Sequence, residues 1–183
     1  DAGGILNLAI FDCDTPIIAA INGAAVGIGA TMTLAMEIRI ASKKSKFAFP
    51  FARRGIVFDG AASFFLPKLV GFSKANEWIL KGNIMMAEEL YDGGLIAEIC
   101  EPEDVLKRSL ELARDIAINC SPTSVSNNKK LLRESMLGKG PFDLHMMESE
   151  MLSKAFASAD CAEGVQSFLD KRSPQFLDRK TNK

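Results

Sequence analysis

The residues best suited to chemistry in this sequence are a glycine-flanked segment, Gly27-Ile28-Gly29, and an acidic turn, Asp59-Gly60. The glycine segment lies between a β-branched run and a short helical stretch, so it predicts a helix N-terminus with unpaired backbone N–H groups. Such groups can hold an anion or a developing oxyanion. The glycines could instead serve only the close packing of a helix on a strand. A dinucleotide site is not indicated, because Met32 stands where the GxGxxG motif has its third glycine.

Asp59 has two interpretations, because it directly precedes a stretch, residues 61–71, whose pattern predicts a helix. An aspartate in this place is commonly the N-cap of the helix. It could also be a general base that faces the oxyanion donors and takes a proton beside a carbonyl group. Phe58, Phe64 and Phe65 flank it and could supply a dry environment for that base. Pro67 predicts a kink or an early end of the same helix.

Other common catalytic sites are absent from the sequence. The only histidine, His145, is expected to be structural, and one histidine cannot form a multi-histidine metal site. GxSxG, the P-loop motif and HExxH do not occur. The four cysteines contain no CxxC pair, which excludes a zinc knuckle and a redox dithiol. We therefore expect no metal site.

Composition limits the partners. With 22 basic and 23 acidic residues in 183, the chain has no net basic field that would attract nucleic acid. No apolar run approaches the roughly 20 residues of a membrane span, and the start lacks the basic region of a signal peptide. The sequence predicts a cytoplasmic protein with neither nucleic acid nor membrane as a partner.

The order of elements predicts an α/β core followed by helices. Residues 16–42 indicate a β-turn-α-β unit with its second strand at Ile38–Ala41, and alternating phenylalanines indicate a third strand at 47–51. We expect residues 1–72 to be part of the core and 73–183 to be a helical region, with a capping box at Asp160 and Glu163 in its last helix. Two of its helices, with Leu106/Leu110 and with Met147/Met151, have more apolar surface than a small core can cover, which predicts self-association.

Four segments, in this order, resemble the crotonase or enoyl-CoA hydratase/isomerase superfamily: TPIIAAINGAAVGIGATMTLAMEIRIAS, KFAFPFARRGIVFDGAASFFLPKLVG, LKGNIMMAEELYDGGLIAEIC and AEGVQSFLDKRSPQF. The resemblance extends from about Thr15 to Phe176. It implies a crotonase-like spiral of ββα units with a C-terminal helical region that forms trimers. It also implies acyl-CoA thioester substrates and an oxyanion hole of two backbone N–H groups. No separate cofactor is implied, because CoA is part of the substrate.

Carried onto this sequence, the resemblance makes the backbone N–H of Ile28 one oxyanion donor. The other donor would lie in an earlier strand-turn that these 183 residues are expected to lack. Since the first residue is Asp1 and not Met, we expect the sequence to be trimmed or to be part of a longer one.

The resemblance also points to a branch of the family. Hydratases use two glutamates to deliver water, and those positions here hold Thr31 and Phe51, which cannot transfer protons at neutral pH. The Δ3,Δ2-enoyl-CoA isomerases place an acidic residue where Asp59 stands. The sequence therefore predicts an enoyl-CoA isomerase that moves a double bond from 3-enoyl to 2-enoyl through Asp59. The alternatives are a hydratase-type lyase and a catalytically silent acyl-CoA binding protein.

The last helix provides two further candidates. FLDKR resembles the family segment that approaches the CoA of a neighbouring subunit, so Phe168 and Lys171 would bind CoA in a homotrimer or hexamer. Otherwise Phe168 would be a core residue of an amphipathic helix and Lys171 a cation that complements the helix dipole.

Overall fold

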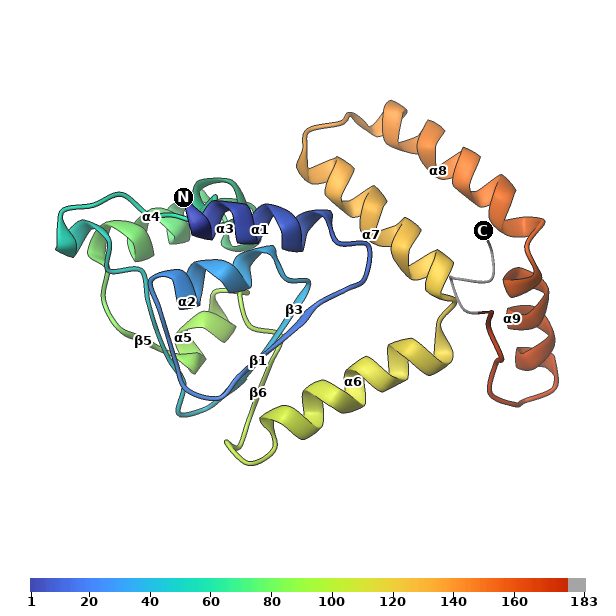
Figure 1. The fold of residues 1–183 in the computed structure, drawn as a ribbon, viewed down its shortest axis with the longest axis horizontal. Helices are drawn as coiled ribbons and strands as arrows, with labels where there is room; N and C mark the ends of the chain where they lie inside the picture. Colours follow the sequence, from blue (N-terminus) through green and yellow to red (C-terminus); the bar gives the residue numbers. More distant parts are fainter. Residues whose placement is uncertain (178–183) are drawn as a thin grey trace. The chain divides into compact units, whose positions relative to one another are not determined.

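The structure is a computed structural model that describes residues 1–177 (Figure 1). The chain divides into two compact units. The first contains Asp1–Cys13 and Ile17–Leu110, and the second contains Asp14–Pro16 and the residues from Glu111 onward. Each unit has its own packing and is described by itself.

The first unit is a spiral in which each successive pair of strands adds one strand to each of two sheets. The parallel sheet contains β1 (Ile18–Ile21), β3 (Ile38–Ser42) and β6 (Glu98–Cys100), in the order β1-β3-β6. The second sheet contains β2 (Ala24–Val26), β4 (Lys46–Ala48) and β5 (Met85–Met86), in which β2 and β4 are parallel and β5 is antiparallel. Ile18 pairs with Ile38 and Ala24 pairs with Lys46, so each ββ step adds one strand to each sheet. The crotonase-like α/β architecture is thereby confirmed.

Short helices connect these strands. They are α1 (Ala2–Asp12), α2 (Ile28–Thr31), the 3-10 helices η1 (Met32–Ala35) and η2 (Ala52–Arg54), α3 (Ala62–Val70), α4 (Phe72–Lys81) and α5 (Ala87–Asp92). Fully buried apolar side chains from strands and helices fill the space between them, among them Ile40, Phe47, Phe65, Leu66 and Leu90. Their burial supplies the main driving force for the fold.

Arg39 of β3 is a charged group inside this core. Its guanidinium donates hydrogen bonds to the backbone carbonyls of Thr33, Met36, Glu37 and Leu95. Desolvation lowers the pKa of Arg39 to about 10. Because four carbonyl oxygens accept from one side chain, Arg39 joins η1 to the segment that precedes β6.

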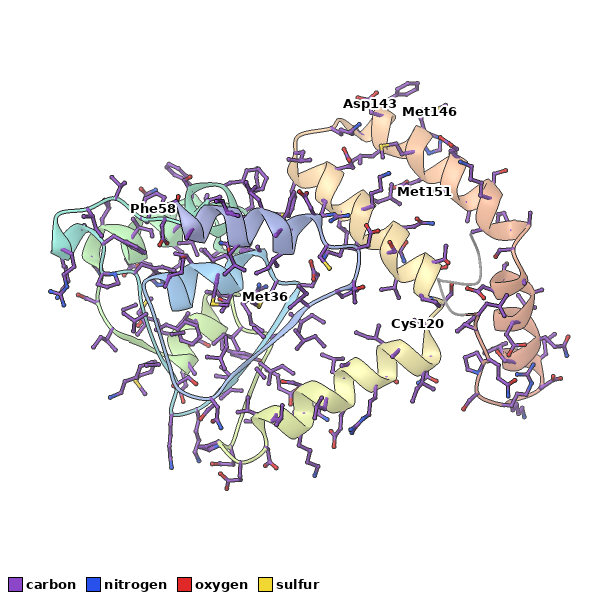
Figure 2. The ribbon with its side chains drawn as sticks, in the orientation of Figure 1. Met36, Phe58, Cys120, Asp143, Met146 and Met151 are labelled. Atoms are coloured by element: carbon purple, nitrogen blue, oxygen red, sulfur yellow. The ribbon has the colours of Figure 1, made fainter. Side chains whose placement is uncertain are left out.

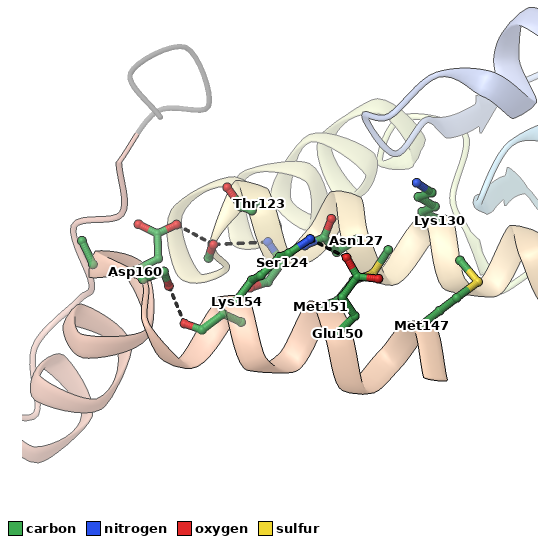
Figure 3. A pocket seen from close by; sticks show the side chains of 13 residues that line it. Thr123, Ser124, Asn127, Lys130, Met147, Glu150, Met151, Lys154 and Asp160 are labelled. Carbon is green, nitrogen blue, oxygen red and sulfur yellow. Dashed lines mark hydrogen bonds and ion pairs between the residues drawn. The ribbon is translucent and has the colours of Figure 1, made fainter. Parts of the chain in front are cut away.

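The second unit is helical. Helix α6 (Val105–Asn119) leads into it, and α7 (Pro122–Met136), α8 (Pro141–Phe156) and α9 (Ala159–Leu169) follow. Helices α7 and α8 pack side by side, and a cavity of about 520 Å³ lies between them beside the start of α9 (Figure 3). The buried carboxylate of Asp160 accepts from Ser121 Oγ at 2.6 Å and from the Leu177 N–H at 3.1 Å, which ties α9 and the residues after it to α7.

Several local predictions were wrong. The third strand ends at Ala48, although Phe49 and Phe51 are buried as well. The segment after residue 72 contains β5 and β6, which are too short to produce a clear strand pattern. Helix α3 continues through Pro67 to Val70. The N-cap of α9 is Ser158, not the expected Asp160 box, because Asp160 is used in the bonds to Ser121 and Leu177.

The apolar surface of α8 also differs from the prediction. Met147 and Met151 face α7 and line the cavity, and Figure 2 shows Met151 on that side of the helix. The exposed apolar side chains of α8 are instead Phe142, Met146, Leu152 and Phe156, and no residue of this helix is buried. Leu106 and Leu110 of α6 are exposed as expected.

We expect Glu163 of α9 to stay charged in acid far below the range of an ordinary glutamate. Its carboxylate accepts from both Arg172 Nη atoms, at 2.6 and 2.9 Å, and from the Gln175 N–H at 2.6 Å. These bonds lower the pKa of Glu163 from 4.5 to about 2. Their contribution to stability should be complete above pH 4.5 and disappear as the pH falls towards 2. A carbon-13 NMR titration of the carboxyl group measures this, and a midpoint near 4.5 would contradict it.

Candidate active site

Three segments that are distant in the sequence meet at one place in the first unit. A methyl group added at Gly3 would lie 2.3 Å from Ile28 Cδ1 and 3.3 Å from Asp59 Oδ2. The first turn of α1, the start of α2 and the turn before α3 are therefore in contact. Phe58, labelled in Figure 2, directly precedes Asp59 in this turn. The two predicted catalytic positions, Ile28 and Asp59, belong to the same site.

The backbone at Gly27 presents the N–H groups of α2. Gly27 has φ +57° and ψ −124°, a conformation that favours glycine, and its N–H donates to the Ala48 carbonyl at 3.1 Å. The first intrahelical bonds come from the N–H groups of Ala30 and Thr31, which both donate to the Gly27 carbonyl. The N–H groups of Ile28 and Gly29 precede these bonds, so the helix itself offers them no acceptor. They can donate to a substrate oxygen.

Asp59 is held by a hydroxyl group and does not cap a helix. Its Oδ1 accepts a hydrogen bond from Thr31 Oγ1 at 2.7 Å, and the residue is half-buried. The N-cap interpretation is wrong, because α3 begins at Ala62 behind Ala61, which has φ +53° and no capping side chain. The carboxylate is directed towards α2 and α1 instead.

Asn7 of α1 fixes the surroundings of this carboxylate. It is fully buried, and its Nδ2 donates to the Thr31 carbonyl at 2.9 Å and to the Gly60 carbonyl at 2.5 Å. Gly60 has φ +65°, and a Cβ there would lie 2.9 Å from Asn7 Nδ2 and 3.0 Å from Thr31 Oγ1. Only glycine fits both the backbone angle and the space.

Helix α1 belongs to the site, although the sequence pattern did not predict it. Asp1 caps this helix by accepting from the Gly4 N–H, and the first turn is packed closely because Gly3 has no side chain. A polar Asn7 within an apolar stretch was the one available signal. The N–H groups of Ala2 and Gly3, at the start of α1, have no intrahelical acceptor.

Ile28 and Asp1 both approach the Asp59 carboxylate, because Asp1 Oδ1 and Asp59 Oδ2 lie 3.1 and 3.3 Å from the same Cβ position of Gly3. Thr31 and Phe51, which the resemblance places at the hydratase glutamates, are buried. The rings of Phe64 and Phe65 pack edge-on against Phe11, with centroids 6.1 and 5.4 Å from it. These ring contacts hold α1 against α3.

Phe168 and Lys171 lie in the second unit, and the structure does not bring them to Asp59 as parts of one compact unit. Phe168 is 81% exposed, so its interpretation as a core residue is wrong. Lys171 is exposed and has φ +55° after the end of α9. Their binding to the CoA of a neighbouring subunit stays a prediction.

His145 and Cys100 are two other titratable side chains in the described part of the chain. His145 is exposed on α8. Burial raises the pKa of the Cys100 thiol. Among residues 1–177, no three His, Cys, Asp or Glu side chains are grouped so that they could hold a metal ion. In the same range, every helix is too short or too polar to cross a membrane.

Comparison with known proteins shows the family. The sequence model of the enoyl-CoA hydratase/isomerase family matches residues 5–179, and the chain belongs to this family. An enoyl-CoA hydratase of Alternaria alternata is 48% identical over 97% of the chain and 60% of the relative's length. A 1,2-epoxyphenylacetyl-CoA isomerase of Escherichia coli is 33% identical over 88% of the chain and 61% of its own length.

Solved structures agree with this assignment. A probable enoyl-CoA hydratase/isomerase of Mycobacterium abscessus has a TM-score of 0.90 and 35% identity, with 92% of this chain and 66% of that chain covered. An enoyl-CoA hydratase of Bacillus anthracis has a TM-score of 0.89 and 26% identity, over 96% of this chain and 68% of that one. The chain spans about 60% of the length of the Alternaria relative.

Proposed function

We propose that this chain carries the catalytic site of an enoyl-CoA isomerase, which moves a double bond from 3-enoyl to 2-enoyl. One observation carries the proposal: Asp59 Oδ2 lies beside Ile28 and the start of α1, where backbone N–H groups are available. An acid that faces oxyanion donors is the arrangement that proton abstraction next to a thioester carbonyl requires. Thr31, at the place of one hydratase glutamate, is bonded to this acid.

The proposed reaction is two proton transfers on one face of the substrate. The thioester oxygen accepts hydrogen bonds from the Ile28 N–H and from the second backbone N–H of the oxyanion hole that the family resemblance implies. Asp59 Oδ2 takes the proton from C2, and the electron pair of that bond forms the enolate. The enolate then regains a proton at C4 from Asp59, and the double bond ends at C2–C3. Asp59 returns to the carboxylate form without any other reactant.

The 48% identical relative supports a second candidate, because it is named an enoyl-CoA hydratase. Hydration needs one group to activate water and another to protonate the substrate. Buried Thr31 and Phe51 supply neither. Hydration would therefore have to use Asp59 for both transfers.

A direct comparison of the two reactions on the complete protein tests the proposal. We expect kcat/KM for isomerisation of a 3-enoyl-CoA to exceed kcat/KM for hydration of the matching 2-enoyl-CoA by about tenfold or more. Loss of the enoyl absorbance measures hydration, and its appearance measures isomerisation. Faster hydration would overturn the isomerase assignment and favour the hydratase.

A further inference from the structure

We infer that Thr31 is a positioning residue, whose hydroxyl occupies Asp59 Oδ1 and leaves Oδ2 as the atom that exchanges the proton with substrate. This inference rests on the proposed role of Asp59. It gives a role in the double-bond shift to Thr31, a side chain that cannot transfer a proton in water addition.

The Thr31 hydroxyl is bonded to one oxygen of the Asp59 carboxylate. Thr31 Oγ1 lies 2.7 Å from Asp59 Oδ1 and 3.4 Å from the Ile28 carbonyl oxygen. A hydroxyl has one hydrogen to donate, and a carboxylate is the stronger of the two acceptors. The Thr31 hydroxyl therefore donates its hydrogen bond to Asp59 Oδ1. The Ile28 carbonyl oxygen, at the longer distance, is a weaker second acceptor for the same hydrogen. Oδ1 therefore has a fixed partner within the protein.

Thr31 is held in place by its burial and by its backbone hydrogen bonds. Its side chain is fully buried. Its N–H donates to the Gly27 carbonyl at 3.0 Å, and its carbonyl accepts from Asn7 Nδ2 at 2.9 Å. Both backbone groups and the hydroxyl are thus bonded, so the position of Oγ1 is set by α1 and α2 together.

Oδ2, the other oxygen of the Asp59 carboxylate, lies towards α1. Asn7 Nδ2 also donates to the Gly60 carbonyl, which fixes the residue next to Asp59 on its other side. Oδ2 is the oxygen that lies 3.3 Å from the Cβ position of Gly3, beside the Ile28 side chain and the Asp1 carboxylate, whose Oδ1 lies 3.1 Å from the same position. When C2–H breaks, the O–H bond forms on Oδ2, and it breaks again when C4–H forms. Oδ1 keeps the Thr31 hydrogen bond during both transfers.

Thr31→Val removes this hydroxyl with little change in shape. We expect it to lower kcat for isomerisation about 10- to 100-fold and to leave KM within about twofold, because a misplaced base slows chemistry more than binding. Thr31→Ser keeps the hydroxyl and should restore most of the parent kcat. Deuterium incorporation at C2 of a saturated acyl-CoA, in deuterium oxide, should follow the same order.

Thr33→Val is the matched control. Thr33 is also buried in this helical segment, but its hydroxyl donates to the Ala30 carbonyl at 2.8 Å, not to Asp59. We expect comparable loss of thermal stability from both valine variants and loss of kcat only from Thr31→Val. If valine at residue 31 unfolds the protein, Thr31→Ala is compared with Thr31→Ser at a temperature where both are folded.

Parent kcat and exchange rates in the variants without the hydroxyl would overturn the inference. An equal loss of kcat in Thr33→Val would also overturn it, since the effect would then be general destabilisation. Failure of the proposed function is recognised separately: Asp59→Asn would then keep C2 exchange at the parent rate.

Discussion

Asp59→Asn should lower the rate of C2 proton exchange and of isomerisation by about 100- to 10,000-fold, the range typical of a positioned general base. Asparagine has the shape of aspartate, and its Oδ1 can still accept from Thr31 Oγ1, which donates to Oδ1 in the parent. Its amide group cannot take the proton. The change therefore removes the chemistry and keeps the packing against α1 and α2. Exchange measured by mass spectrometry reports the base without depending on which enoyl isomer is preferred.

Asp92→Asn is the control, because Asp92 is an exposed aspartate at the end of α5 and far along the chain from the site. It should have the parent rate. Affinity for an acyl-CoA should stay within about threefold in both variants, since neither change removes a proposed oxyanion donor. If Asp59→Asn keeps the parent exchange rate, Asp59 is not the base. If the parent itself binds acyl-CoA and shows no exchange, the silent binding protein is the correct alternative.

The sequence was sufficient for the parts of the site that depend on local patterns. The β-branched run, the Asn22-Gly23 turn and the glycines after it predicted β1 and the start of α2, whereas the three-residue strand β2 was not predicted. Gly27 shows why: its positive φ is a local requirement that few other residues meet. Asp59 could also be singled out from the sequence, because it directly precedes residues 61–71, whose pattern predicts a helix.

The contacts that define the site were not visible in the sequence. Asp59 is 28 residues from the hydroxyl that holds it, and Asn7 is 53 residues from the carbonyl of Gly60. Such pairings follow from how the spiral turns stack, and no periodicity reports them. Helix α1 was missed because its apolar residues surround the helix without a polar face and its first turn contains Gly3 and Gly4.

Thr31, which the resemblance places at a hydratase glutamate, differs from that glutamate in more than the loss of an acid. Two carboxylates at this distance would repel each other, and one of them would tend to hold a proton. A hydroxyl at residue 31 instead donates a hydrogen bond to Asp59 Oδ1 at 2.7 Å, which an ionised carboxylate could not do. One acid that gives back the proton it took is sufficient for a double-bond shift.

The second large effect should be on assembly. Helix α8 has no buried residue, and its exposed apolar side chains Phe142 and Phe156 are each at least 70% accessible. A surface of this kind, with Met146 and Leu152 beside it, is expected to be covered by another copy of the chain. We expect sedimentation of the complete protein at micromolar concentration to show a trimer or hexamer. Phe156→Glu should shift the protein to monomers, because a buried interface aromatic is commonly worth about 2 kcal/mol or more.

Asn128→Glu provides the matched control, because it adds the same charge to an exposed polar position on α7. It should leave the assembly intact. Thermal unfolding of the Phe156→Glu variant distinguishes a lost interface from a damaged fold. Phe156 is exposed within one chain, so its replacement should not unfold the monomer. The predicted CoA binding by Phe168 and Lys171 across subunits would depend on the same assembly, so we expect the Phe156→Glu monomer to bind acyl-CoA more weakly. A parent protein that sediments as a monomer would contradict both the trimer and the proposed role of Lys171.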